Sequence, residues 1–328
     1  MTCFAFSNVL ILPLPTGLST TGVNSTKLGS LYLNQLGMDK PDASTSGTFT
    51  LGGDLTLNRL GFGAMRITGS GIWGEPADVE GAKKVLRRAV ELGVNFIDTA
   101  DSYGPEVSER LIAEALHPYP KELVIATKGG LTRQGPNKWA PVGRPEYLQQ
   151  CVEMSLRRLR VERIDLYQLH RIDPKVPAEE SLGILRDLQK AGKIRHVGLS
   201  EVSPAEIERA KKTVAVISVQ NQYNLGDRRH EDVVTYCEKN GLGFIPWFPV
   251  AAGKLTSVGG PLEKAAKSNN ATMAQLALAW LLHRSPVILP IPGTSSTAHL
   301  EENIRAGEIR LDENEWKALE QSAQSAKA

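Results

Sequence analysis

The sequence predicts an α/β fold, a (β/α)8 TIM barrel with an N-terminal β-hairpin and a C-terminal helix. From Thr48 onward, short apolar runs alternate with longer amphipathic segments. This alternation repeats through eight strand–helix units, which indicates a parallel sheet long enough to close on itself. Polar side chains also follow several strands at the end where such barrels hold their functional groups.

The predicted strands are short runs rich in β-branched and aromatic residues. Before the first of them, two short apolar segments, residues 48–51 and 55–58, flank Gly52, Gly53 and Asp54, a pattern typical of a β-hairpin. The barrel strands are expected over residues 59–65, 94–98, 123–128, 164–170, 196–200, 216–220, 243–247 and 287–290.

The predicted helices show a 3.6-residue apolar period and are bounded by start and stop signals. Pro105, which follows Gly104, is expected in the first turn of the second helix. The helices are expected over residues 78–91, 107–116, 145–159, 178–190, 204–212, 231–239, 272–283, 297–306 and 312–323.

A doubly wound open sheet is the alternative to the barrel. Such a fold binds a dinucleotide at a glycine-rich turn after its first strand. Here Gly61 and Gly63 are present, but Arg66 occupies the place of the third glycine. This substitution disfavours the open sheet.

Residues 1–47 differ from the rest of the chain, since they show no sustained period and are rich in Ser, Thr, Gly and Asn. A secretory signal is disfavoured because no Lys or Arg precedes Lys27. The segment is interpreted as a disordered leader or a misassigned start, with Met38 as a plausible initiator. Residues 48–328 are then a single domain.

Composition restricts the class of partner. The net charge of +2, without long basic runs, disfavours nucleic acid and anionic membranes, so small molecules are the expected partners. The three cysteines lie far apart and lack metal-type spacing, which favours a reducing, cytoplasmic location without a zinc site or disulfides. A monomer or small homo-oligomer is expected.

Four polar residues are expected at the ends of consecutive strands. Asp98 ends the second strand, Lys128 the third and His170 the fourth, while Tyr103 follows the second. A buried Lys128 requires an acidic partner, for which Asp98 is the candidate, and its charge would lower the pKa of Tyr103. Taken singly, each residue fits a structural role, such as a cap, a rim charge or a packed ring. Their joint occurrence favours an active site with Tyr103 as general acid.

The segments GVNFIDTADSYG, IATKGG and IDLYQLH resemble the signature segments of the aldo-keto reductase family. The resemblance extends over residues 48–323 and is greatest to pyridoxal reductase-like, bacterial-type members. It places the family's catalytic tetrad on Asp98, Tyr103, Lys128 and His170. It implies a metal-free enzyme that reduces aldehydes or ketones by direct hydride transfer from NADPH, in preference to NADH.

The resemblance also implies a cofactor site across the mouth of the barrel. Ser200 and Gln220 match the positions that hold the carboxamide, Trp247 matches the ring-stacking aromatic, and Glu201 replaces the usual Asn. The implied cofactor contacts are Ala64, Met65, Asp98, Ser200, Glu201, Gln220, Trp247, Phe248, Val250, Gly253, Leu255, Gly293, Thr294, Ser295, His299, Glu302 and Asn303.

The adenosine end of that site is expected at the segment IPGTSSTAHLEEN. Hydroxyl groups of Thr294 and Ser295 precede a helix whose N-terminus favours a phosphate. Gly293 and His299 replace the Lys and Arg that many members direct at the 2′-phosphate, so cationic charge is removed from this site.

The loops predict an aromatic-walled substrate pocket. Arg66, Trp73 and Trp139 are expected to line it together with Tyr103 and His170. Such walls suit a flat ring, for example a pyridoxal-like or aryl aldehyde. The alternative function is a regulatory or interaction protein that senses the cofactor on the same fold with little turnover.

Overall fold

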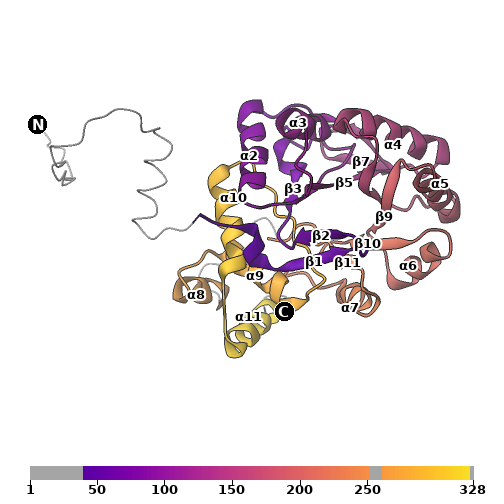
Figure 1. Ribbon diagram of the computed structural model, residues 1–328. Helices are drawn as coiled ribbons and strands as arrows, with labels where there is room; N and C mark the ends of the chain where they lie inside the picture. The colour runs from indigo at the N-terminus through magenta and orange to yellow at the C-terminus, as the bar shows by residue number, and fades with distance from the viewer. Residues whose placement is uncertain (1–39, 251–260, 326–328) are drawn as a thin grey trace, which may run out of the picture. The chain divides into compact units, whose positions relative to one another are not determined.

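A curled sheet of parallel strands forms the centre of the folded unit, which begins at Pro41. The structure is a computed structural model that describes residues 40–250 and 261–325 (Figure 1). The sheet has seven strands in the order β11-β10-β9-β8-β5-β4-β3. These strands are β3 (Phe62–Gly63), β4 (Phe96–Asp98), β5 (Val124–Gly129), β8 (Ile164–Leu169), β9 (Ile194–Ser200), β10 (Val216–Gln220) and β11 (Gly243–Phe244).

Residues 287–292 close the sheet into a ring. Ile288 forms a parallel bridge with Phe244 on one side. On the other side, the Gly61 N–H donates to the carbonyl of Pro290 (2.9 Å). Proline has no N–H, so this segment cannot form a complete ladder and is not a regular strand, although one was predicted over 287–290. The predicted (β/α)8 barrel is confirmed.

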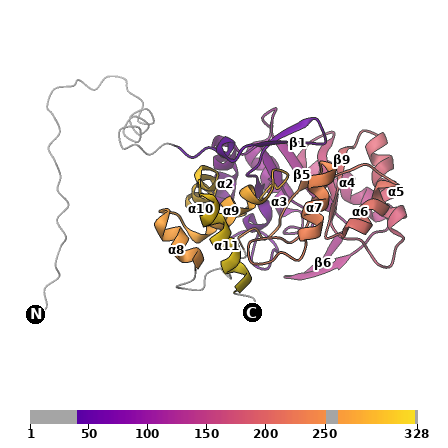
Figure 2. The same ribbon diagram turned by 90° about the horizontal axis from the view of Figure 1, so that it is seen from below.

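The N-terminal hairpin closes one end of the barrel. β1 (Thr48–Leu51) pairs antiparallel with β2 (Leu55–Asn58), as predicted. Leucines of this hairpin extend into the barrel interior and pack on strand side chains there; this inner cluster contains Leu51, Leu55, Leu57, Phe96, Val124, Ala126, Leu166, Ile245, Leu289 and Ile291. Figure 2 shows β1 and β6 on opposite sides of the barrel.

Helices cover the outside of the sheet (Figure 1). In α4, Leu148, Val152, Leu156 and Leu159 repeat at helical spacing and are all buried, which is why this segment packs as an amphipathic helix. The helices are α2 (Val79–Glu91), α3 (Val107–Leu116), α4 (Pro145–Leu159), α5 (Ala178–Lys190), α6 (Pro204–Lys211), α7 (Glu231–Asn240), α8 (Pro261–Ser268), α9 (Met273–Arg284), α10 (Thr297–Ile304) and α11 (Glu313–Ser325).

The structure differs from the sequence-based expectations at several places. The first strand ends at Gly63, because the chain then turns into the short 3-10 helix η2 (Ala64–Ile67). Pro105 is not in the first turn of α3, since Glu106 takes a left-handed conformation (φ 69°) before the helix begins. Helix α8 and a second hairpin, β6 (Leu131–Gly135) with β7 (Lys138–Pro141), were not predicted.

Residues 41–47, which the sequence pattern groups with the leader, pack on the barrel. They contain the 3-10 helix η1 (Ala43–Ser46), in which Ala43 is fully buried. The Ala43 N–H donates to the carbonyl of Leu92 (2.8 Å). Within the described residues, no helix is both long and apolar enough to cross a membrane.

Candidate active site

A layer of polar side chains lies at the carboxyl ends of β4, β5, β8 and β10, directly above the apolar interior. Side chains alternate between the two faces of a strand, so Asp98 shares the inward face of Phe96, and Lys128 that of Ala126. Gln168 follows Leu166 in the same way. These polar side chains are almost completely buried, and Gln220 on β10 completes the layer.

Asp98 and Lys128 form the central ion pair of this layer. Lys128 Nζ lies 2.5 Å from Asp98 Oδ1, and both side chains are 2% exposed or less. The amides of Gln168 and Gln220 donate to the other carboxylate oxygen at 2.9 and 2.8 Å. Burial lowers the pKa of Lys128, but the charges and hydrogen bonds of Asp98 and Tyr103 together outweigh burial, and the net shift is upward. Lys128 is therefore a cation held in place by Asp98.

Tyr103 completes this centre from the loop after β4. Lys128 Nζ donates to the Tyr103 hydroxyl at 3.3 Å. Burial raises the pKa of Tyr103, Lys128 opposes that shift, and the net direction is upward. Lys128 thus lowers the pKa of Tyr103, as expected, but the net shift is upward because burial dominates and Asp98 offsets the charge of Lys128. Tyr103 carries its proton at neutral pH.

His170 faces Tyr103 across the mouth. The two rings meet edge to face at 6.0 Å, and the ring of Trp139 lies 6.4 Å from each. Burial, together with the charges of Lys128 and Arg171, lowers the pKa of His170 well below its usual value. His170 is therefore neutral, and its Nδ1 lies 3.4 Å from the Ser102 hydroxyl.

Arg133 organises the outer wall of the mouth. Its guanidinium donates to the carbonyls of Ile72 (2.5 Å) and Ser102 (2.8 Å). It also stacks 3.6 Å from the ring of Trp139 and 5.6 Å from that of Trp73. One side chain thereby connects the β6–β7 hairpin, the loop at Trp73 and the loop that carries Tyr103.

Glu201 holds the ring of Trp247. Its Oε1 accepts a hydrogen bond from Trp247 Nε1 (2.6 Å) and another from the Gln222 N–H (2.7 Å). Glu201 follows β9 in a left-handed conformation (φ 56°), which turns its side chain toward β10 and the segment after β11. Phe248, also left-handed, places its ring 6.1 Å from that of Trp247.

The start of α10 lies next to the place where residues 287–292 close the barrel against β3. Ser296 caps the helix and accepts from the His299 N–H. At Gly293, an added Cβ would lie 2.4 Å from the Gly63 carbonyl oxygen, so the two backbones pack in direct contact. The same Cβ would lie 3.5 Å from Arg66 Cγ. Arg66 therefore lies beside Gly293.

Comparison with known proteins identifies the class. The sequence model of the Aldo/keto reductase family matches residues 59–324. The chain belongs to the aldo-keto reductase family. An uncharacterized oxidoreductase of Schizosaccharomyces pombe is 53% identical over 287 residues, covering 88% of this chain and 93% of the relative. Pyridoxine 4-dehydrogenase of Escherichia coli is 42% identical over 282 residues, covering 84% of this chain and 98% of the relative.

Solved aldo-keto reductase structures share the fold. A glycerol dehydrogenase of Gluconobacter oxydans superposes with a TM-score of 0.77 at 28% identity, covering 85% of this chain and 96% of its own. An aldo/keto reductase of Klebsiella pneumoniae, solved with NADP and acetate, superposes with a TM-score of 0.71 at 26% identity, covering 84% of this chain and 94% of its own. This chain is accordingly an oxidoreductase of that family.

The structure of this aldo-keto reductase brings together the four residues predicted as catalytic, with Ser200 and Gln220 beside them. Ser200 is 2% exposed, and its hydroxyl accepts from Arg171 (2.9 Å). Ala64 and Met65 follow β3, and Val250 is half-buried after Phe248. Gly253 and Leu255 lie outside the described residues.

The residues predicted at the adenosine end lie around α10. Thr294 is buried, whereas Ser295 and His299 are exposed. Glu302 accepts from the Thr272 hydroxyl (2.6 Å), and Asn303 is half-buried beside it.

Sequence reasoning missed Gln168 and Arg133. Gln168 lies two residues after the inward-facing Leu166, so strand alternation could have indicated it. Arg133 lies in the hairpin that was not predicted, and no local signal shows its contacts. Within residues 40–250 and 261–325, no group of His, Cys, Asp and Glu is arranged to hold a metal ion.

Proposed function

We propose that this chain reduces an aldehyde or ketone to the alcohol with a nicotinamide cofactor, and that Tyr103 donates the proton. The contact of Lys128 with both Asp98 (2.5 Å) and Tyr103 (3.3 Å) carries the proposal. It places a protonated phenol and a compensated cation together at the mouth of the barrel, where proton donation to a carbonyl oxygen is possible.

The residues at the mouth fit a carboxamide. Ser200 Oγ already accepts a bond from Arg171, so its own proton remains to donate. The Gln220 amide nitrogen donates to Asp98 and Gln168, which leaves its oxygen to accept. One donor and one acceptor match the oxygen and the N–H of an amide. The NADP bound in the Klebsiella pneumoniae reductase supports NADPH as the cofactor here.

When bound, the cofactor would supply a hydride to the carbonyl carbon. Tyr103 then gives its proton to the carbonyl oxygen, and Lys128 stabilises the negative charge that is left on the phenol oxygen. If the Ser102 hydroxyl donates to His170 Nδ1, the ring proton lies on Nε2, which can donate to the substrate oxygen. A neutral His170 orients the carbonyl and leaves proton donation to Tyr103.

The substrate is proposed to carry a flat ring. Trp139 lies edge to face with Tyr103 and His170, and Trp73 is held beside Trp139 through Arg133. The relationship to Escherichia coli pyridoxine 4-dehydrogenase supports a pyridoxal-like aldehyde. Arg66 is proposed to face the cofactor phosphates rather than the substrate, because its side chain lies beside Gly293.

The test is NADPH oxidation by the purified protein with pyridoxal, aryl aldehydes and small ketones. Tyr103→Phe should cut turnover by about a hundredfold or more, since one hydrogen-bond and proton donor at the developing alkoxide is removed. The affinity for NADPH, measured by fluorescence, should remain close to that of the wild type. Near-normal turnover in the variant, or tight NADPH binding without reduction of any carbonyl substrate, contradicts the proposal.

A further inference from the structure

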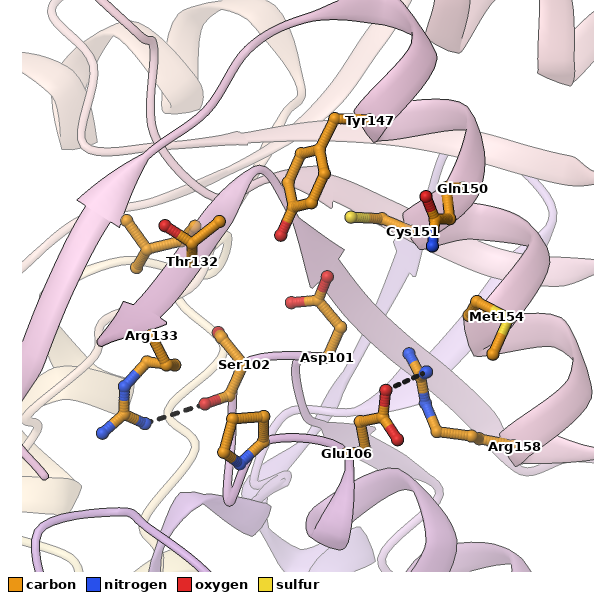
Figure 3. A pocket seen from close by; sticks show the side chains of 12 residues that line it. Asp101, Ser102, Glu106, Thr132, Arg133, Tyr147, Gln150, Cys151, Met154 and Arg158 are labelled. Atoms are coloured by element: carbon orange, nitrogen blue, oxygen red, sulfur yellow. Dashed lines mark hydrogen bonds and ion pairs between the residues drawn. The ribbon is translucent and has the colours of Figure 1, made fainter. Parts of the chain in front are cut away.

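A second cavity, of about 260 Å³, lies beside the loop between β4 and α3 (Figure 3). Its walls come from that loop, from α4 and from the β6–β7 hairpin. None of the four residues proposed as catalytic lines it. Ser102 and Arg133, which also contribute to the mouth, line this cavity, so the cavity adjoins the mouth on the other side of the loop that carries Tyr103.

Asp101 projects into this cavity. It is 9% exposed, and its Oδ1 has no hydrogen-bond partner in the described part of the chain. Figure 3 shows the carboxyl group pointing toward the space between Tyr147 and Thr132. The Asp101 backbone is fixed, because its N–H donates to the Lys128 carbonyl (3.1 Å) and its carbonyl accepts from the Glu106 N–H (2.7 Å). One oxygen of this buried carboxyl group is thus held in place without a donor, while the group also accepts hydrogen bonds from Cys151 and the Ser102 backbone.

The arginines near the cavity are engaged elsewhere. Arg158 pairs with Glu109 (2.5 Å) and Glu106 (3.1 Å). Arg133 donates its bonds to backbone carbonyls, among them those of Gly71 (2.9 Å) and Ser102 (2.8 Å). Arg133 keeps its positive charge, because backbone carbonyls do not neutralise it. The three carboxylates Asp101, Glu106 and Glu109 still exceed the two guanidinium groups by one negative charge when Asp101 is ionised, and a cation would compensate that charge.

The groups that face Asp101 come from three elements. Burial raises the pKa of Asp101 to about 7, and the charge of Glu109 on α3 adds to the shift. Hydrogen bonds from Cys151 and the Ser102 backbone and the charge of Arg158 on α4 oppose it. Cys151 and Tyr147 on α4 and Tyr167 on β8 are neutral, because burial raises their pKa values. Asp101 is therefore the group of this cluster that changes charge near neutral pH.

Leu131, Met154 and Pro105 supply an apolar part of the wall, and Ser102, Thr132 and Gln150 also line the cavity. A ligand for this cavity needs a cationic donor at one end and hydrocarbon at the other. We propose that the cavity binds a small protonated amine, with its ammonium group on Asp101 and its alkyl chain against Met154 and Leu131. The volume lies below that of pockets for drug-sized ligands, about 300–1,000 Å³, so the amine is small.

The proposal is tested by titration with n-butylamine, observed through the ¹³C-labelled methyl groups of methionine. Met154 lines the cavity, whereas Met65 follows β3 at the mouth of the barrel. At pH 8 the Met154 resonance, assigned with Met154→Leu, should shift saturably while that of Met65 stays in place. n-Butanol, which has the same chain without the charge, should leave both unchanged.

The pH dependence gives a second test in the unaltered protein. Alkyl amines stay protonated from pH 6 to 8, so only Asp101 changes charge in the proposed site. With a pKa of about 7, binding should be about tenfold weaker at pH 6 than at pH 8, following the fraction of ionised Asp101.

Asp101→Asn should abolish the Met154 shift, because an amide cannot compensate the ammonium charge. Asp187→Asn, which neutralises an exposed carboxylate on α5, is the matched control and should bind like the wild type. Absence of a saturable Met154 shift, an equal response to butanol, equal affinity at pH 6 and 8, or retained binding in Asp101→Asn would each overturn the proposal.

Discussion

Asp98 and Asp101 lie three residues apart, and both are buried, but their carboxylates meet different surroundings. Asp98 accepts from Lys128, Gln168 and Gln220 at 2.5 to 2.9 Å. Asp101 retains an oxygen without a partner, and burial raises its pKa to about 7. Burial alone therefore does not determine the chemistry of a carboxylate in this fold. The number of donors that reach it decides whether it fixes a cation or changes charge near neutral pH.

The difference arises from local geometry. Asp98 ends a strand on the same face as Phe96, so it points into the barrel, where side chains of neighbouring strands converge. Asp101 lies in the following loop, outside this alternation, and points toward α4 (Figure 3). The same short segment thus supplies Asp98 to the mouth of the barrel and Asp101 to the cavity beside the β4–α3 loop.

Removing the charge of Asp98 should have the largest effect on stability. Asp98→Asn leaves the buried Lys128 ammonium uncompensated, and breaking such a pair costs about 3–5 kcal/mol. Urea unfolding at pH 7 measures the loss. Asp187→Asn, an exposed carboxylate, should stay within about 0.5 kcal/mol of the wild type. A loss below about 1 kcal/mol in Asp98→Asn would contradict the role of this ion pair.

Removing one hydrogen-bond donor from Asp98 should leave one of its carboxylate oxygens less well satisfied, as in Asp101. Gln168→Leu deletes the amide that donates at 2.9 Å and keeps a similar volume. Hydrogen bonds to charged groups contribute about 1.5–3 kcal/mol, so a loss in this range is expected in the same urea experiment. Unchanged stability would show that Lys128 and Gln220 are enough to stabilise the buried Asp98 carboxylate without Gln168.

Asp101→Asn should raise the stability of the protein above pH 7, whereas Asp98→Asn and Gln168→Leu should lower it. The raised pKa, about 7 against the ordinary 3.8, means that the folded protein binds this proton more tightly than the unfolded chain does. Wild-type stability is therefore lost as the pH rises from about 4 to about 7. A rise in pKa from 3.8 to about 7 corresponds to about 4 kcal/mol, so the variant should be more stable at pH 8 by up to about 4 kcal/mol, and the gap should close near pH 4. A gap that does not change with pH argues against this titration.

Glu201 is a third carboxylate at a strand end, and the smallest effect is expected there. Glu201→Ala removes the acceptor for the Trp247 indole, a contact of about 0.5–1.5 kcal/mol, so the Kd for NADPH should rise by about threefold to tenfold. Glu201→Gln keeps an acceptor oxygen and should bind like the wild type. Equal weakening in both variants would show that the charge, rather than the hydrogen bond, matters.

Local sequence signals were sufficient for most of the fold. Helix α4 was predicted with its observed bounds because Pro145 starts it and an apolar stripe runs along it. The β6–β7 hairpin was missed although Gly135, Pro136 and Asn137 are turn residues, since a regular strand–helix alternation was expected there.

The candidate site was predictable in its residues but not in its energetics. Strand ends indicated Asp98 and Lys128, yet the direction of the Tyr103 pKa shift depends on burial, which no local pattern reveals. Likewise, Glu201 and Trp247 lie 46 residues apart, so their hydrogen bond exists only through the folded sheet. Distances between strands, and not residue types, determine these properties.

The contact between Gly63 and Gly293 limits how the cofactor preference of this enzyme could be redesigned. A lysine grafted at position 293 to attract a phosphate would bring its Cβ to 2.4 Å from the Gly63 carbonyl oxygen. The graft would require the backbone to shift where β3 meets residues 287–292. Engineering of this end of the cleft should begin instead at Arg66, where the side chain can be exchanged without moving the backbone.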